Sequence, residues 1–245
     1  MSDDNKQPVL LPPKIVRVEV DDQHYYFVND EFFPSVTKIL DEAGPVAWAL
    51  KNWLLTNTPE SANEIKTTTA DFGTLMHDAY QRLLLGDEIS LKDDFNNTKA
   101  KKHLMSFHRW FHEFAPDVNT MQTEHTVASV KNKFAGTLDL SCKKDGELWI
   151  IDFKTTSGIY YSHELQLTAY KIAYEELYKV KVDHVGILRT GTRHKSEFEF
   201  KEITREPQEF LNVYQTYLSL NGGEIPKPPD IKAYPDTIKL FEERS

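Results

Sequence analysis

The chain has 245 residues, of which 40% are hydrophobic and 12% aromatic, which is ample for a packed core. Its single cysteine, Cys142, excludes an internal disulfide and a four-cysteine metal site. The formal net charge of -9 argues against a protein that coats nucleic acid with its whole surface. The first residues lack the apolar core of a signal peptide, and no run approaches the ~18 apolar residues of a membrane span. We therefore expect a soluble protein in the cytoplasm or another reducing intracellular compartment.

The first half of the chain is expected to be mainly helical. Residues 1–14 are polar and proline-containing, which predicts a flexible leader. Alternation over 15–20 and 24–28 then predicts a hairpin, and Ser35 is placed to cap a short helix that ends near Gly44. Apolar residues at helical spacing predict three further helices, over residues 46–55, 68–85 and 98–114.

The second half is expected to form a sheet with helices packed on it. Three successive strands over 121–130, 134–143 and 147–154 predict an antiparallel meander. The remaining elements follow in the order helix, strand, strand, helix, over residues 162–178, 184–190, 197–202 and 206–220. This order predicts an α/β fold with a mixed central sheet. We expect one domain over 15–221, with a mainly helical part 15–116 and a core 117–221, followed by an extended tail 222–245.

Charged residues follow two neighbouring strands of the predicted meander. One segment ends in Gly-Thr-Leu-Asp139, and the next runs Leu148-Trp-Ile-Ile-Asp152-Phe-Lys154, so that each strand is expected to end with a charge. Residues two apart on a strand point to the same face, so Asp152 and Lys154 project together while Phe153 points into the packing. Asp139 is expected within reach of Asp152.

Two carboxylates this close repel each other unless a cation lies between them. Mg²⁺ or Mn²⁺ prefers such oxygen ligands together with water and a substrate phosphate, so the pattern predicts a metal site. A lysine beside the metal can stabilise negative charge that develops on a phosphate, which makes Lys154 a catalytic candidate together with Asp139 and Asp152. The alternative is a cross-strand ion pair with no catalytic role.

The ordered set of motifs resembles RecB-like nucleases of the PD-(D/E)XK superfamily. Besides the two charged strands, the resemblance includes an upstream histidine in Gly73-Thr-Leu-Met-His77, a helix with Gln166-Leu-Thr-Ala-Tyr170, and an opening segment Phe33-Pro-Ser-Val-Thr-Lys-Ile-Leu40. Relatives with an iron–sulfur cluster carry four cysteines, whereas this chain has one. The likeness is therefore to the cluster-free phage-type and mitochondrial-type exonucleases, and it implies a restriction-endonuclease-like core.

The resemblance also implies roles for individual residues. It assigns metal ligation to His77, Asp139, Asp152 and the backbone carbonyl of Phe153, with Lys154 acting on the attacking water. A lone helical histidine is otherwise more often a packing residue, and it suits Mn²⁺ better than Mg²⁺.

Three further residues are weaker candidates. Glu124, on the first strand of the meander, is a candidate for a second metal or for holding the lysine, with an ordinary solvated strand residue as the alternative. Gln166 and Tyr170 lie four apart on one helix face, which would contact DNA. The alternative is that the tyrosines of this face, among them Tyr174 and Tyr178, cover the sheet.

The sequence thus predicts a metal-dependent DNA nuclease, in the first instance an exonuclease that acts on single strands or ends. A second hypothesis is an endonuclease, or a nuclease subunit whose helicase or recombination partner supplies affinity for DNA, which suits the acidic charge. A third is a noncatalytic DNA- or protein-binding module that keeps the fold.

Overall fold

A computed structural model describes residues 12–20, 23–45, 58–193 and 197–228. The helix expected over 46–55 and most of the leader and tail lie outside the described residues. Within them, no helix combines the length and the apolar character that crossing a membrane requires.

A small three-stranded antiparallel sheet opens the described chain. It is formed by β1 (Ile15–Val20), β2 (Gln23–Val28) and β3 (Glu31–Phe33) in that order. Sequence patterns indicated the first two strands but not the three-residue β3. Tyr26, Val28 and Phe33 pack from this sheet against Ala128 and Ala135 of the central sheet, so the hairpin is fixed to the core of the protein.

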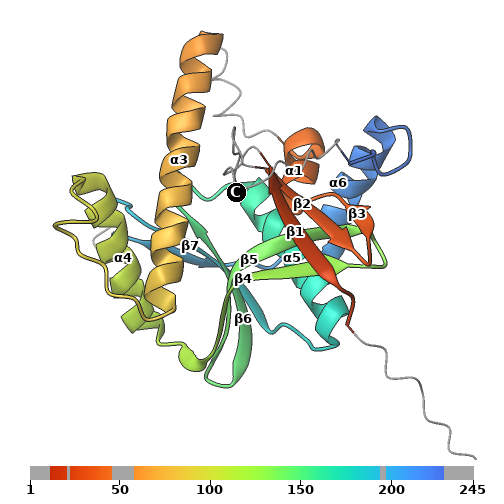
Figure 1. Cartoon of the computed structure of the whole chain (residues 1–245). Helices are drawn as coiled ribbons and strands as arrows, with labels where there is room; N and C mark the ends of the chain where they lie inside the picture. Colours follow the sequence, from red (N-terminus) through yellow and green to blue (C-terminus); the bar gives the residue numbers. More distant parts are fainter. Residues whose placement is uncertain (1–11, 21–22, 46–57, 194–196, 229–245) are drawn as a thin grey trace, which may run out of the picture.

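Among the described residues, three helices follow before the central sheet begins. Helix α1 (Val36–Ala43) starts where the Ser35 side chain accepts a hydrogen bond from the Lys38 backbone, as expected for an N-cap. Helix α3 (Pro59–Leu84) is longer than the sequence pattern indicated, and α4 (Thr98–Phe114) has the expected bounds. Figure 1 shows α3 extending well beyond the sheet, with α4 beside its other end.

The central sheet has five strands in the order β4-β5-β6-β7-β8. All neighbours pair antiparallel except β6 and β7, which are parallel, so the expected mixed sheet is confirmed. The parallel pair is possible because α5 (Tyr161–Tyr178) crosses over between its two strands. The bounds are β4 (Asp117–Ser129), β5 (Phe134–Lys144), β6 (Glu147–Lys154), β7 (His184–Arg189) and β8 (Glu199–Glu202).

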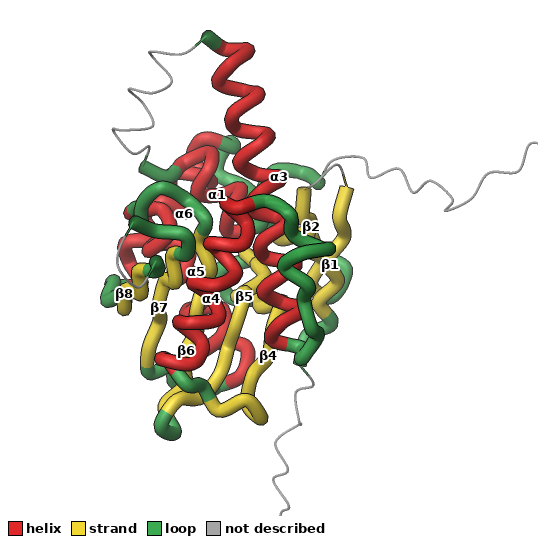
Figure 2. Tube along the Cα trace, turned by 90° about the vertical axis from the view of Figure 1, so that its left-hand side faces the viewer, coloured by secondary structure: helices red, strands yellow, loops and turns green. Residues whose placement is uncertain are grey.

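Helices cover both faces of the central sheet (Figures 1 and 2). On one side α1, α5 and α6 (Pro207–Leu220) pack around Ile150 and Ile187. On the other side α3 and α4 pack around Ile151 and Phe153. Because neighbouring residues of β6 alternate between the two cores, Asp152 and Lys154 face α5 while Phe153 faces α3 and α4.

A buried carboxylate joins α5 to the last strand of the sheet. The Glu164 side chain is only 7% exposed and forms ion pairs with Lys201 at 2.6 Å and with Arg205 at 2.5 Å. Burial alone would raise the pKa of Glu164, but the hydrogen bonds from Lys201 and Arg205 outweigh it and lower that pKa. A lowered carboxyl pKa stabilises the fold at neutral pH, and this stabilisation is lost as the pH falls below the ordinary value.

We expect Glu164→Gln to lower the free energy of unfolding by about 1–3 kcal/mol at pH 7, because two cations lose their charged partner. The difference from wild type should shrink when urea denaturation is repeated below the usual glutamate pKa of 4.5. Glu42→Gln is the control, since Glu42 pairs with Lys38 on the surface of α1 and should contribute less than about 1 kcal/mol. Equal effects of the two substitutions would contradict this account.

Candidate metal centre and active site

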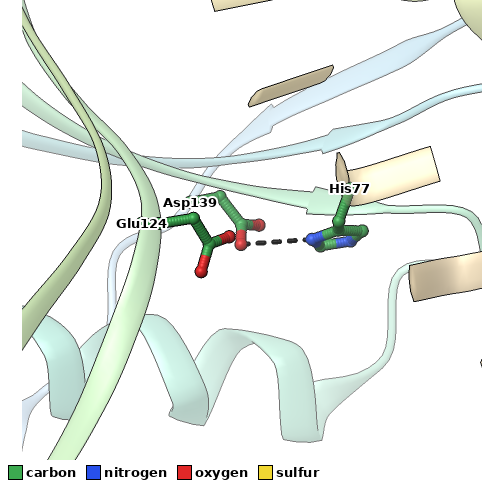
Figure 3. A group of neighbouring side chains, drawn as sticks. All are labelled: His77, Glu124 and Asp139. Atoms are coloured by element: carbon green, nitrogen blue, oxygen red, sulfur yellow. Dashed lines mark hydrogen bonds and ion pairs between the residues drawn. The ribbon is translucent and has the colours of Figure 1, made fainter. Parts of the chain in front are cut away.

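Asp139 lies at the middle of a group of polar side chains from four elements. Its Oδ1 is 3.2 Å from Nδ1 of His77 on α3 (Figure 3). Its Oδ2 accepts a hydrogen bond from the Phe153 backbone at 2.6 Å. The expectation that both strands end with a charge is wrong for Asp139, which lies in the interior of β5. The predicted strand over 134–143 agrees with β5, which continues to Lys144 in pairing with β6.

Strand pairing explains how the two aspartates meet. Leu140 lies opposite Ile151 in the β5–β6 register, so Asp139 and Asp152 are the next residues along their strands. Burial and Asp139 both raise the pKa of Asp152, to about 6, against the opposing effect of Lys154. Burial also disfavours the charged form of Asp139, but His77 and Lys154 outweigh it and lower the pKa of Asp139. Neighbouring carboxyl groups with pKa values shifted in opposite directions are typical of acid–base sites.

Glu124 completes the group from strand β4. Thr123 and His125 lie opposite Leu140 and Leu138, which places Glu124 across from Asp139. Its φ of 47° is left-handed, which is uncommon for a residue inside a strand and costs of order 1–3 kcal/mol. Backbone strain of this kind is found preferentially at functional positions.

A divalent cation fits these donors. Among the described residues, one group of possible ligands is brought together, and it offers one atom each from His77, Glu124 and Asp139, all within 4.8 Å of one another. One imidazole nitrogen and two carboxylate oxygens suit Mn²⁺ or Mg²⁺, which would also offset the repulsion between the carboxylates. The structure groups Glu124, which was a candidate for a second metal, with His77 and Asp139, and ligation by Asp152 and by the Phe153 carbonyl stays a prediction.

Asp152 is buried and begins a chain of polar contacts that runs to α5. Its Oδ2 is 2.8 Å from Nζ of Lys154, and that ammonium also donates to Oε1 of Gln166 at 2.9 Å. The Gln166 amide in turn donates to the Tyr170 hydroxyl at 2.8 Å. Gln166 is 9% and Tyr170 3% exposed. These contacts hold Lys154 in one orientation, whereas contact of Gln166 and Tyr170 with DNA stays a prediction.

The metal-ligand group opens into a cleft of about 450 Å³. One wall comes from α3, one from the central sheet, and one from the N-terminal β1–β2 hairpin, which contributes Arg17, Glu19, His24 and Tyr26. Sequence reasoning assigned the hairpin no role. The wall from α3 includes Gly73 and Thr74 of the histidine motif.

Comparisons with known proteins agree with this arrangement. The family model of the PD-(D/E)XK nuclease superfamily matches residues 42–237, which is most of the chain. The chain therefore belongs to the PD-(D/E)XK nuclease superfamily, and its mixed sheet with flanking helices is consistent with the core of that superfamily. A search of curated proteins finds no match.

Two solved structures are similar at a low level. One is the crystal structure of a protein from Eubacterium rectale named "Putative exonuclease", with 14% identity, coverage of 85% of this chain and 91% of that chain, and a TM-score of 0.44. The other is the crystal structure of SSO0001, with 11% identity, coverage of 60% and 85%, and a TM-score of 0.33. Neither likeness is strong enough to support a statement on activity.

Gly136 of β5 makes room for the Tyr170 ring. A Cβ atom at Gly136 would lie 2.5 Å from Cε1 of Tyr170, and that ring is buried and cannot move freely. We expect Gly136→Ala to lower the free energy of unfolding by about 1–3 kcal/mol, measured by urea denaturation. Gly158→Ala is the matched control, because its added Cβ would be 3.6 Å from the nearest atom of Tyr160. A Gly136→Ala protein as stable as the control would show that the ring is not tightly held.

Proposed function

We propose that this chain is a divalent-metal-dependent deoxyribonuclease that hydrolyses phosphodiester bonds. The observation that carries the proposal is the juxtaposition of the His77–Glu124–Asp139 group with the ion pair between buried Asp152 and partly buried Lys154, in a chain of the PD-(D/E)XK superfamily. We further propose that residues 15–221 act as one nuclease domain.

Within this proposal, different residues of the chain hold the metal ion and stabilise the phosphate. His77, Asp139 and Glu124, with Asp152 as a further candidate, would hold Mg²⁺ or Mn²⁺. The bound ion would polarise a phosphate oxygen and favour ionisation of a water molecule. Lys154 is the last residue of β6, and its contacts with Gln166 and Asp152 fix the position of its positive charge. A fixed cation can stabilise the negative charge that grows on the phosphate during hydrolysis.

We propose an exonuclease that acts on single-stranded or end-containing DNA, following the resemblance to cluster-free exonucleases. The second candidate is an endonuclease or the nuclease subunit of a helicase or recombination complex. The net charge of -9 favours that subunit, because a partner would then supply the basic surface that DNA binding needs. A noncatalytic module is disfavoured, since such a module has no need of an Asp152–Lys154 ion pair beside the ligand group.

The test measures degradation of labelled linear single-stranded DNA, double-stranded DNA, circular single-stranded DNA and RNA, each with Mg²⁺, Mn²⁺ or a chelator. We expect metal-dependent degradation of linear single strands, with circular strands spared. Lys154→Met and Asp152→Asn should each lower kcat by roughly 100-fold or more. Lys38→Met removes a partly exposed charge from α1 and should leave the rate unchanged.

Each contrary outcome has a definite meaning. Cutting of circular strands would replace the exonuclease with an endonuclease. Faster degradation of RNA than of DNA would contradict the substrate class. A wild-type protein that cuts nothing with either metal, even at high concentration, would leave the partner-dependent subunit or the binding module.

A further inference from the structure

Arg17 of β1 reaches the candidate metal centre from the N-terminal sheet. Its Nη1 donates to Oε2 of Glu124 at 3.1 Å, across 107 positions of sequence. Glu124 is one of the three grouped ligand candidates, so its carboxylate lies between a guanidinium on one side and the atoms of His77 and Asp139 on the other. Both the Arg17 and Glu124 side chains are about 30% exposed, at 29% and 30%, so they can be reached from the cleft.

The charges that line the cleft make Arg17 distinctive. Among the described residues, Arg17 is the one lysine or arginine in the cleft wall, while Glu19, Asp78, Glu124 and Asp139 are acidic. A phosphodiester that enters this cleft meets mainly negative groups and therefore needs a cationic contact. A guanidinium suits this task because its planar set of donors matches two phosphate oxygens.

Arg17 is held in the cleft by more than one contact. Its Nη2 lies 3.2 Å from Nε2 of His24 and 3.5 Å from a carboxylate oxygen of Glu19. These neighbours belong to the same hairpin, so they would keep the side chain in place if Glu124 moved. A guanidinium has five N–H donors, which leaves capacity for a phosphate.

The Glu124 carboxylate cannot bind the Arg17 guanidinium and a divalent cation at full strength at the same time. A carboxylate oxygen that ligates a divalent cation gives up much of its attraction to a neighbouring guanidinium, because the doubly charged ion competes for the same electrons. We propose that Arg17 and Glu124 form an exchange pair, in which Arg17 holds Glu124 without a cation and binds a substrate phosphate once Glu124 has turned to the cation. This proposal rests on the proposed nuclease function and adds a phosphate-binding residue to it.

The pair predicts effects of opposite sign from one substitution. In Arg17→Met, Glu124 is free for the cation, so calorimetry should show Mn²⁺ binding tightened by roughly 3-fold or more. Binding of a short single-stranded oligonucleotide with Mn²⁺ should weaken by roughly 10-fold, and its salt dependence should decrease by about one counterion. The oligonucleotide carries phosphorothioate linkages, which keep their negative charge and resist hydrolysis, so that it stays intact while Lys154 is retained. Lys14→Met, which removes an exposed charge just before β1, should change neither value.

A second variant tests the pair without altering Arg17. In chelator, Glu124→Gln should strengthen oligonucleotide binding, because the guanidinium is released from its carboxylate. Part of any gain in binding would come simply from removing a negative charge. The double variant Arg17→Met/Glu124→Gln therefore completes a double-mutant cycle, which isolates the interaction between the two residues. We expect most of the gain to disappear in the Arg17→Met background, which a general charge effect would not produce.

The outcomes separate this proposal from the function on which it rests. If Arg17→Met weakens Mn²⁺ and oligonucleotide binding together, or changes neither, the exchange pair is wrong although the nuclease stands. Additive effects in the cycle would overturn it equally. If the protein with Arg17 intact binds no oligonucleotide with Mn²⁺, the proposed function fails and the exchange pair fails with it.

Discussion

The carboxylate of Asp139 is the contact on which the candidate site depends. One oxygen meets His77 of α3 and the other accepts the backbone N–H of Phe153 in β6, so a single side chain on β5 connects three elements. A buried carboxylate is tolerated only when such partners compensate its lost hydration. Asp139 therefore links α3 to β6 beside the last β5–β6 pair, Leu140 and Ile151, and brings the imidazole of His77 to the cleft.

Lys154 is constrained in a different way, by a chain of neutral and charged hydrogen bonds that crosses from β6 to α5. Asp152 and Gln166 share its ammonium, and Tyr170 completes the chain beside Gly136. Buried polar groups are costly unless they find partners, so these contacts restrict Lys154 to few arrangements. The crossover helix thus does more than join two parallel strands, because the same helix orients the lysine at the end of the first of them.

The local patterns of the sequence were sufficient for most of the elements and for part of the site. Alternation in β6 correctly placed Asp152 and Lys154 on one face and Phe153 on the other, and the periodicity of α3 placed His77 on a helix. Glu124 could be only a weak candidate, because the left-handed φ of 47° that distinguishes it within β4 has no signal in a strand pattern. Arg17 was not found at all, since its contact with Glu124 arises from the packing of the hairpin on the central sheet.

The acidic balance of the chain and a phosphodiester substrate are compatible once charge is considered locally. A net charge of -9 repels nucleic acid at long range, and screening limits that repulsion to about 10 Å at moderate salt. At contact distance the relevant charges are the few groups in the cleft, where a divalent ion held by His77, Glu124 and Asp139 would neutralise the two carboxylates that ligate it. Affinity for substrate would then depend on the cation and on Lys154 more than on a broad basic surface. In such an enzyme, metal binding and substrate binding would be tightly coupled, and general affinity for nucleic acid would be low.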